Sequence, residues 1–435
     1  MVRLVSSFLL ATLAATSVWA ADPPKCGAGS KCPKEYPCCS QYGECGTGAY
    51  CLGGCDPLTS FSLDSCAPEP VCKSQTYKWD NLDSAAMNTK YLGDASKSDW
   101  VYSGFPKVED GNLLLTMPKE SVGSLFANNH YIWYGKISGK IKSSRGSGVV
   151  SAFILLSDVK DEIDFEFVGS DLANVQTNYY FQGILDYGHG ANASVDSNTF
   201  EQWHDYEIDW KPDQITWSVD GDVKRTLTRE STWNETSNRY QYPQTPSRMQ
   251  LSLWPAGQAS NAAGTIAWAG GEIDWDSEDI KDKGYYYATF GEIKVECYDP
   301  PKDAVKKGDK AYIFTNSDGI ESSIQITNNK TVLASFGASG LDMDVKPKSS
   351  GTATGTATGN NTVPENRGGS GNEPGSSNGS SGGGSSGGSG SSGFNQGGSD
   401  DSSTTGSNGA SSASERVLRS SFLAVLVAIV VLVAL

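Results

Sequence analysis

Short runs in which apolar and polar side chains alternate recur through the central part of the chain. The clearest are residues 135–142 (GKISGKIK), 206–210 (YEIDW) and 214–219 (QITWSV). Alternation with a period of two is typical of strands that bury one face. Polar turns such as Asp220-Gly221 separate such runs, and no long helical periodicity interrupts them. The pattern predicts an all-β sandwich between about residues 77 and 298.

The first 20 residues have a different pattern, with Arg3 followed by an apolar run that includes residues 8–10 (FLL). Val18-Trp19-Ala20 follows before Ala21, where the small alanines form a cleavage site. This arrangement predicts a secretory signal peptide over residues 1–20. A membrane-spanning helix is the alternative, but the apolar run is shorter than the ~20 residues that a bilayer requires.

The other end of the chain, residues 422–435, is uninterruptedly apolar but again short for a bilayer. A polar spacer over residues 411–421 precedes it, and small residues around Asn408 precede the spacer. This order predicts a GPI-anchor propeptide over residues 409–435, with attachment at Asn408. Ser407 or Gly409 would serve nearly as well for attachment, and a plain C-terminal membrane helix is the alternative.

Residues from about 348 to 408 are mainly Gly, Ser, Thr and Asn. Such a segment cannot bury enough surface to fold, so we expect a flexible, O-glycosylated stalk. The preceding segment, 300–345, has a mixed composition and is either a late strand pair or part of the stalk. N-glycosylation sequons, which suit a secreted chain, begin at Asn192, Asn234, Asn329, Asn360 and Asn378.

The net charge of the chain is −16 at pH 7. An acidic chain repels phosphate backbones, which argues against nucleic acid as a partner. Together with the signals at both ends, the charge indicates a protein that works outside the cell, on a GPI tether to the membrane or at the cell surface.

Ten cysteines are present, and all except Cys297 lie between Cys26 and Cys72. An even number, clustered in a secreted chain, implies disulfides rather than zinc thiolates. A block this short could not stabilise itself through an apolar core alone.

The cysteine block resembles a hevein-type chitin-binding module over residues 26–66. The resemblance rests on the adjacent pair Cys38-Cys39 and on the segment 40–46 (SQYGECG), within the set Cys26, Cys32, Cys38, Cys39, Cys45 and Cys51. It implies that N-acetylglucosamine is held by Ser40, Tyr42 and Tyr50. Glu44 stands where the family has a third aromatic residue. The alternative is a disulfide knot that only spaces or orients the rest of the protein.

The chain has four cysteines beyond the six that match that module, namely Cys55, Cys66, Cys72 and Cys297. Their order in the chain predicts one bridge between Cys55 and Cys66 and another between Cys72 and Cys297. The second bridge would tie together both ends of the central domain. Connectivity cannot be read directly from a sequence, so this pairing is a hypothesis from chain order.

The segment 161–169 (DEIDFEFVG) places Glu162, Asp164 and Glu166 at alternate positions. In a strand these three carboxylates share one face, and the apolar residues between them face the other way. Acidic residues are depleted in strands, so three of them on one strand face indicate a functional role. Two carboxyl groups separated by ~5 to 5.5 Å are the nucleophile and acid/base of a retaining glycosidase. A solvated strand face and a calcium site are the alternatives, although no Asp-rich loop surrounds the row.

The same segment resembles the Glu-x-Asp-x-Glu signature of glycoside hydrolase family sixteen, a β-jelly-roll family of retaining enzymes. Gly169 and an Asn-Tyr segment, 177–179 (TNY), follow the carboxylates as in that family. Residues 203–210 (WHDYEIDW) and 215–221 (ITWSVDG) resemble its paired strands. The resemblance implies a jelly-roll β-sandwich over residues 75–298.

Two later segments, 248–257 and 264–271 (GTIAWAGG), resemble the Crh branch of that family. These are GPI-anchored fungal wall transglycosylases that join chitin to glucan. With the secretion signal, cysteine block, stalk and anchor, the resemblance covers nearly the whole chain.

By this resemblance Glu162 is the nucleophile, Asp164 the assisting carboxylate and Glu166 the acid/base. The sugar cleft would be lined by Glu166, Arg248, Trp254, Thr265 and Trp268. Trp254 and Trp268 could equally pack without touching sugar, and His204 is interpreted as a packing or hydrogen-bonding residue. Nothing resembles a metal site, a cofactor site or a Ser/His/Asp set.

The function expected from the resemblance is a two-step transfer by a monomeric enzyme. Chitin is the donor, and β-glucan or a chitin oligosaccharide is the acceptor, which crosslinks the fungal cell wall. The alternatives are a plain endo-hydrolase of chitin or β-glucan, a non-catalytic wall lectin and a structural wall protein.

Overall fold

The computed structural model describes residues 23–184, 186–347 and 363. The predicted signal peptide, GPI propeptide and, apart from Val363, the stalk lie outside these residues. So do Asn360, Asn378 and the predicted attachment site Asn408. Within the described residues, no helix is both long enough and apolar enough to cross a membrane.

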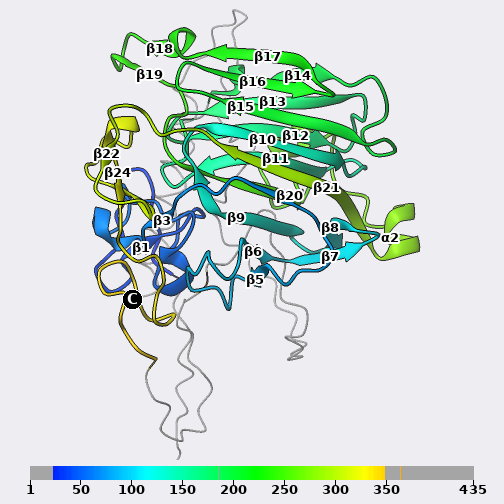
Figure 1. Ribbon diagram of the computed structural model, residues 1–435. Coiled ribbons are helices and arrows are strands. Elements are labelled where there is room, and N and C mark those ends of the chain that lie inside the picture. The colour runs from blue at the N-terminus through cyan, green and yellow to red at the C-terminus, as the bar shows by residue number, and fades with distance from the viewer. Residues whose placement is uncertain (1–22, 185, 348–362, 364–435) are drawn as a thin grey trace, which may run out of the picture. The chain divides into compact units, whose positions relative to one another are not determined.

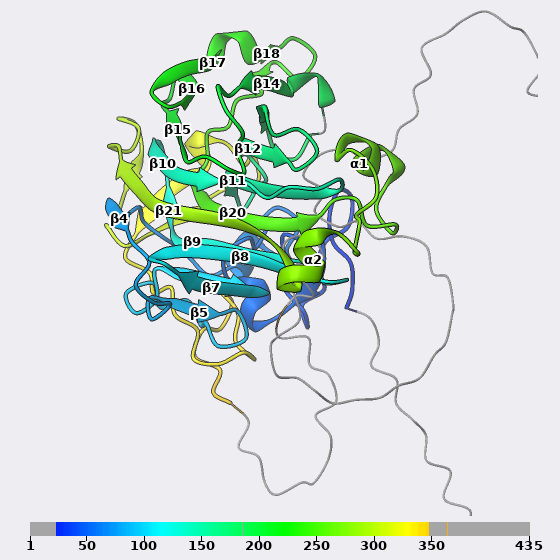
Figure 2. The same ribbon diagram turned by 90° about the vertical axis from the view of Figure 1, so that its right-hand side faces the viewer.

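Two eight-stranded sheets form a β-sandwich (Figures 1 and 2). The first, called here the outer sheet, has the order β17 (Asp222–Thr228), β16 (Gln214–Val219), β15 (His204–Trp210), β10 (Gly135–Lys142), β21 (Tyr285–Cys297), β8 (Asn112–Pro118) and β7 (Phe105–Glu109), and β4 (Gln75–Tyr77) also pairs with β21. The second, called here the cleft sheet, has the order β14 (Ala191–Ser194), β13 (Asn174–Tyr180), β12 (Glu162–Val168), β11 (Val149–Ser157), β20 (Ser247–Pro255), β9 (Ser124–Ile132), β6 (Trp100–Ser103) and β5 (Ala85–Met87).

Shorter elements complete the fold. They are β1 (Cys38–Cys39), β2 (Cys45–Gly46), η1 (Gly48–Cys51), η2 (Leu63–Ser65), β3 (Glu69–Pro70), η3 (Tyr187–His189), η4 (Arg229–Thr232), β18 (Trp233–Asn234), β19 (Arg239–Tyr240), α1 (Ala263–Trp268), α2 (Glu278–Lys283), β22 (Val305–Lys306), β23 (Ala311–Phe314), η5 (Glu321–Ser323) and β24 (Ile324–Thr327).

The alternating runs of the sequence form strands of the outer sheet, with one face buried. In β10 and β15 buried residues alternate with more accessible ones, because the inner face packs on the cleft sheet. Phe165 of β12 meets Tyr206 of β15 edge to face, with ring centroids 5.4 Å apart. Asp220 and Gly221, with φ of 52° and 85°, form the tight turn that the sequence predicts between β16 and β17.

The cysteine module, defined here as residues 26–66, is held by disulfides. These pair Cys26 with Cys39, Cys32 with Cys45, Cys38 with Cys51, and Cys55 with Cys66. A fifth bridge, Cys72–Cys297, closes the sandwich across 225 residues. The last two pairings are those that the order of cysteines in the chain predicts.

The segment 300–345 is a late strand pair rather than part of the stalk. Its strands β23 and β24 pair with each other, and β23 also pairs with β3, directly after the cysteine module. Further on, Gly48 N donates to Ala338 O at 2.9 Å and Thr47 Oγ1 to Phe336 O at 3.0 Å. Figure 1 shows this yellow segment beside the blue module. The chain therefore returns from the sandwich and packs on the module.

Candidate active site

A buried carboxylate, Asp161, lies directly before the strand that carries the acidic row. Its carboxylate accepts hydrogen bonds from the backbone N of Gln182, Gln244 and Thr245, and from Thr245 Oγ1 at 2.7 Å. Burial raises the pKa of Asp161 to about 6, and the donated hydrogen bonds oppose that rise. Asp161 thus joins β12 to the segment that leads into β20. The acidic row starts with the residue that follows.

The three carboxylates of β12 are buried rather than solvated. Glu162, Asp164 and Glu166 are 6%, 1% and 3% exposed, so the alternative of a solvated strand face does not hold. Ile163 and Phe165, between them, belong to the main core. The two faces of β12 therefore have separate roles, one packing the sandwich and the other carrying charge.

The carboxylates change one another's protonation. The pKa of Glu166 is well above its usual range, because the group is buried and lies near the charge of Glu162. The pKa of Asp164 is also well raised, first by burial, then by the charges of Glu162 and Glu166 and by a hydrogen bond with Glu162. Three acids in one low-dielectric site resist full ionisation, so Asp164 and Glu166 hold their protons more tightly than isolated carboxyl groups do.

The neighbouring strand β13 presents polar side chains to the row. Tyr180, Asn178 and Gln176 stand opposite Glu162, Asp164 and Glu166, respectively. Asn178 Nδ2 donates to Tyr180 Oη at 2.9 Å, which holds both side chains beside the carboxylates.

No motif in the sequence assigns a role to Asp161, Gln176 or Tyr180. Their positions in the chain are the only local indication of a role. Asp161 adjoins the acidic row, and Gln176 and Tyr180 lie two residues either side of Asn178, so that in a strand all three share one face. Which of them faces the carboxylates depends on the register of β13 with β12.

Two of the tryptophans predicted to contact sugar lie together. Trp254 of β20 and Trp268 of α1 are nearly parallel, with ring centroids 6.2 Å apart. Trp268 Nε1 donates to Gln176 Oε1 at 2.8 Å, which connects the pair to the residue opposite Glu166. Trp254 is opposite Val150, which is opposite Val168, so it shares the carboxylate face beyond the Glu166 end. Thr265, on the same helix as Trp268, is fully buried.

Residues 94–270 match the family described as glycosyl hydrolases family 16, and this range contains the whole acidic row. The chain is 74% identical to Crh-like protein 2 of Aspergillus fumigatus over 443 residues, which covers 100% of both chains. The chain belongs to the Crh-like proteins of this family.

Another relative and a solved structure are also similar to the chain. Congo red hypersensitive protein 2 of Saccharomyces cerevisiae is 49% identical over 321 residues, covering 73% of this chain and 68% of that protein. Among solved structures, the Crh5 transglycosylase in complex with NAG is 30% identical, with a TM-score of 0.50. The alignment covers 62% of this chain and 99% of that one.

In this Crh-like chain Arg248 lies apart from the tryptophan pair. It is opposite Leu156, which is opposite Glu162, so it shares the carboxylate face at the Glu162 end. Its guanidinium is buried against the cysteine module, where Nη2 donates to Gln41 Oε1 at 3.4 Å. The pKa of the neighbouring Glu69 is well raised, mainly by burial and by Asp158, and Arg248 opposes that rise.

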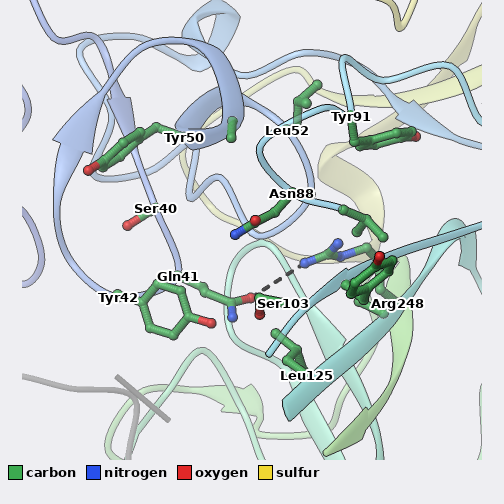
Figure 3. Close-up of a pocket in the computed structure, with 15 residues that line it drawn as sticks. Ser40, Gln41, Tyr42, Tyr50, Leu52, Asn88, Tyr91, Ser103, Leu125 and Arg248 are labelled. Atoms are coloured by element: carbon green, nitrogen blue, oxygen red, sulfur yellow. Dashed lines mark hydrogen bonds between the residues drawn. The ribbon is translucent and has the colours of Figure 1, made fainter. Parts of the chain in front are cut away.

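The predicted sugar-binding residues of the module are also buried. Ser40, Tyr42 and Tyr50 are 3%, 4% and 2% exposed, and all three line one pocket with Arg248 (Figure 3). Glu44, at the third aromatic position, pairs with Lys25, whose Nζ lies 2.6 Å from Glu44 Oε1. The module therefore turns its predicted sugar face toward the cleft sheet.

The remaining predicted residues are His204, on β15 of the outer sheet, and the sequon asparagines, of which Asn192 stands opposite Gln176 and so lies two strands from Glu166. His204 Nδ1 is 2.7 Å from Asp220 Oδ2 and its Nε2 is 2.9 Å from Ser197 Oγ, which fits a structural hydrogen-bonding role. Of the sequon asparagines, Asn192 and Asn329 are exposed and Asn234 is partly exposed.

Proposed function

We propose that this Crh-like protein cleaves a β-1,4-linked N-acetylglucosamine chain and transfers it to β-glucan or to a chitin oligosaccharide. The observation that carries the proposal is the pairing of Glu162 and Glu166 on one buried strand face, with the pKa of Glu166 well raised. One carboxyl group then retains its proton while the other is available as an anion. That division of roles is what a retaining mechanism requires.

In the first step Glu166 donates its proton to the glycosidic oxygen. The bond between the anomeric carbon and that oxygen breaks, and a carboxylate oxygen of Glu162 forms a bond to the anomeric carbon. The part of the chain beyond the cleaved bond leaves with the proton. Asp164, whose pKa is well raised, donates a hydrogen bond to Glu162 and so orients it.

In the second step Glu166, now ionised, takes the proton from an acceptor hydroxyl. That oxygen attacks the anomeric carbon, and the bond to Glu162 breaks. Transfer requires that a sugar hydroxyl reach the intermediate before water does. The stacked Trp254 and Trp268, beyond the Glu166 end of the row, offer an aromatic surface on which a saccharide could be held.

The solved Crh5 transglycosylase in complex with NAG supports a carbohydrate substrate of this class. The resemblance of the chain to GPI-anchored wall enzymes supports action at the cell surface or in the fungal wall, by a monomer tethered through its C-terminus.

The test uses the purified protein with chitin oligosaccharides as donor and a fluorescent β-1,3-glucan oligosaccharide as acceptor. Labelled products longer than the acceptor are expected from the wild type and from Glu292→Gln, a matched change at an exposed glutamate on β21. Neither Glu162→Gln nor Glu166→Gln should form them. The two changes keep the size of the side chain and remove only its ionisable oxygen.

Other outcomes of the same experiment would distinguish the alternative functions. Shortened donor without labelled product would identify an endo-hydrolase that uses the same residues. Wild-type protein that binds oligosaccharide but alters neither substrate would return the chain to the lectin interpretation. Full activity in Glu162→Gln would contradict the assignment of the nucleophile.

A further inference from the structure

The carboxylate face of the cleft sheet continues well beyond β12. Register places Glu166 opposite Ala152, Ala152 opposite Ser252, Ser252 opposite Leu125, and Leu125 opposite Ser103. Residues directly opposite each other in a sheet share a face. A saccharide chain that crosses the strands from Glu166 would therefore run over β11, β20, β9 and β6 in turn.

The cysteine module covers the far part of this face. A pocket lies between the two, and Figure 3 shows side chains from both sides of it. Ser40, Gln41, Tyr42 and Tyr50 come from the module, and Ser103, Leu125 and Arg248 come from the cleft sheet. With strands about 4.8 Å apart, β20 lies about 10 Å and β6 about 19 Å from the catalytic strand. The pocket is thus on the same face as the acidic row and a few sugar units from it.

Direct contacts hold the module in this position. Gly54 N donates to Asp158 Oδ1 at 2.8 Å and to Tyr131 Oη at 3.2 Å. Gly53 has no side chain at the point where the guanidinium of Arg248 approaches, and a Cβ there would lie 2.3 Å from Nη1. On its other side the module is packed by the returning segment through Ala338 and Phe336. These contacts fix the module against the cleft sheet, so the two walls of the pocket keep their positions relative to each other.

The chemistry of the pocket suits a saccharide. Tyr42 and Tyr50 supply aromatic surface, and Ser40, Gln41 and Ser103 supply hydroxyl and amide groups. Two of its polar atoms, Ser103 Oγ and Arg248 Nε, are buried and have no hydrogen-bond partner among the described residues. Both residues are more than nine-tenths buried. Such groups are normally satisfied, which points to a ligand with hydroxyl or acetamido oxygens.

We propose that the cysteine module and the cleft sheet together form a distal subsite, which binds the same saccharide chain that reaches Glu162 and Glu166. The inference rests on the proposed glycosyl transfer and specifies how a long chain is held. The module is then a wall of the cleft, and its tyrosines select long chains for reaction.

Binding is measured first, by calorimetry in the Glu162→Gln background, so that the proposal is tested without turnover. Chitobiose is the short probe and chitohexaose the long one. Tyr42→Ala is expected to weaken chitohexaose binding about fivefold or more and to leave chitobiose unchanged. Tyr36→Ala is the matched control, because Tyr36 is an exposed tyrosine of the same module, outside the pocket. It should leave both affinities unchanged.

A second variant approaches the pocket from the sheet. Val101 of β6 also lines it, and Val101→Phe fills part of its volume without altering the module. This variant should reproduce the length-dependent loss, and its melting temperature is checked against that of the parent. The proposal is overturned if Tyr42→Ala weakens binding to insoluble chitin while both oligosaccharide affinities stay unchanged. It is also overturned if Val101→Phe, folded like the parent, binds chitohexaose normally.

Active enzyme then shows which substrate occupies the subsite. Tyr42→Ala in an otherwise wild-type chain should raise KM for the long substrate and leave kcat unchanged. A change in the donor KM would identify a donor subsite, and a change in the acceptor KM an acceptor subsite. An unchanged KM for both would contradict the proposal. If the wild type transfers nothing but chitohexaose binding depends on Tyr42, then the proposed function fails and the saccharide subsite stands.

Discussion

Asp161 and Thr245 join the start of β12 to the segment that leads into β20, two strands away in the same sheet. Thr245 donates to Asp161 Oδ2 from both its hydroxyl, at 2.7 Å, and its backbone N, at 3.1 Å. Gln244 N donates to the same oxygen at 2.9 Å. One buried carboxylate thus fixes the position from which Glu162 and the rest of the acidic row extend.

Replacement of Asp161 by alanine should therefore destabilise the folded protein. It leaves several buried donors without an acceptor, each worth about 1–3 kcal/mol. We expect Asp161→Ala to lower the free energy of unfolding by at least about 3 kcal/mol, and Thr245→Val, which removes one donor, by about 1 kcal/mol. Denaturant unfolding of the disulfide-intact protein measures both. Equal losses in the two variants would show that Asp161 is no more than one partner of Thr245.

The raised pKa of Glu166 predicts an activity profile displaced to higher pH. Glu166 must be protonated to act as the acid, so kcat/KM should fall as the pH rises through its pKa, above the ordinary carboxyl range near about 4.3. Asp164→Asn retains a donor toward Glu162 and does not titrate, so the basic limb should stay in place. A basic limb in the ordinary carboxyl range would contradict the assignment of Glu166 as the acid.

The same shifts have a consequence for stability. Because the folded state binds the protons of Glu166 and Asp164 more tightly than the unfolded chain, these groups favour folding at low pH. Their contribution should decline as the pH rises above the ordinary carboxyl range. In Glu166→Gln the free energy of unfolding should fall less steeply with pH than in the wild type. Parallel pH curves for the two proteins would contradict this.

Trp268 should affect substrate binding more than chemistry. Trp268→Phe keeps an aromatic ring beside Trp254 but loses the hydrogen bond to Gln176, worth about 1 kcal/mol. We expect KM for oligosaccharides to rise roughly fivefold with little change in kcat. Trp203→Phe, a change on the outer sheet, serves as the control, because Trp203 contacts Lys142 there. A loss confined to kcat would place Trp268 in the chemical step.

The disulfides Cys72–Cys297 and Cys55–Cys66 should contribute different amounts to the free energy of unfolding. In the chain-entropy description, a bridge that closes more chain stabilises more. Cys72–Cys297 spans 225 residues and Cys55–Cys66 only 11. Paired replacement by serine should therefore cost about 5 kcal/mol for the first and about 3 kcal/mol for the second. Thermal unfolding of both variants provides the comparison, and a larger loss for the short bridge would reverse it.

Features that depend on the local backbone could be predicted from the sequence. Residues 135–142 and 214–219 form β10 and β16, and Asp220-Gly221 forms the turn. Glu162, Asp164 and Glu166 share one face because side chains alternate along every strand, whatever surrounds it. Their burial was not predictable, since an acidic row looks the same in sequence whether solvent or protein covers it.

The sequence by itself therefore determined the strands, the turn and the common face of the acidic row, because each depends on residues a few positions apart. Only the tertiary structure decided which side chains surround that row and what covers its far end. Gln176 faces Glu166 through strand register, and Gln41 meets Arg248 across 207 positions of the chain. Contacts of that range follow from how whole layers pack together, and no local pattern of apolar and polar residues records them.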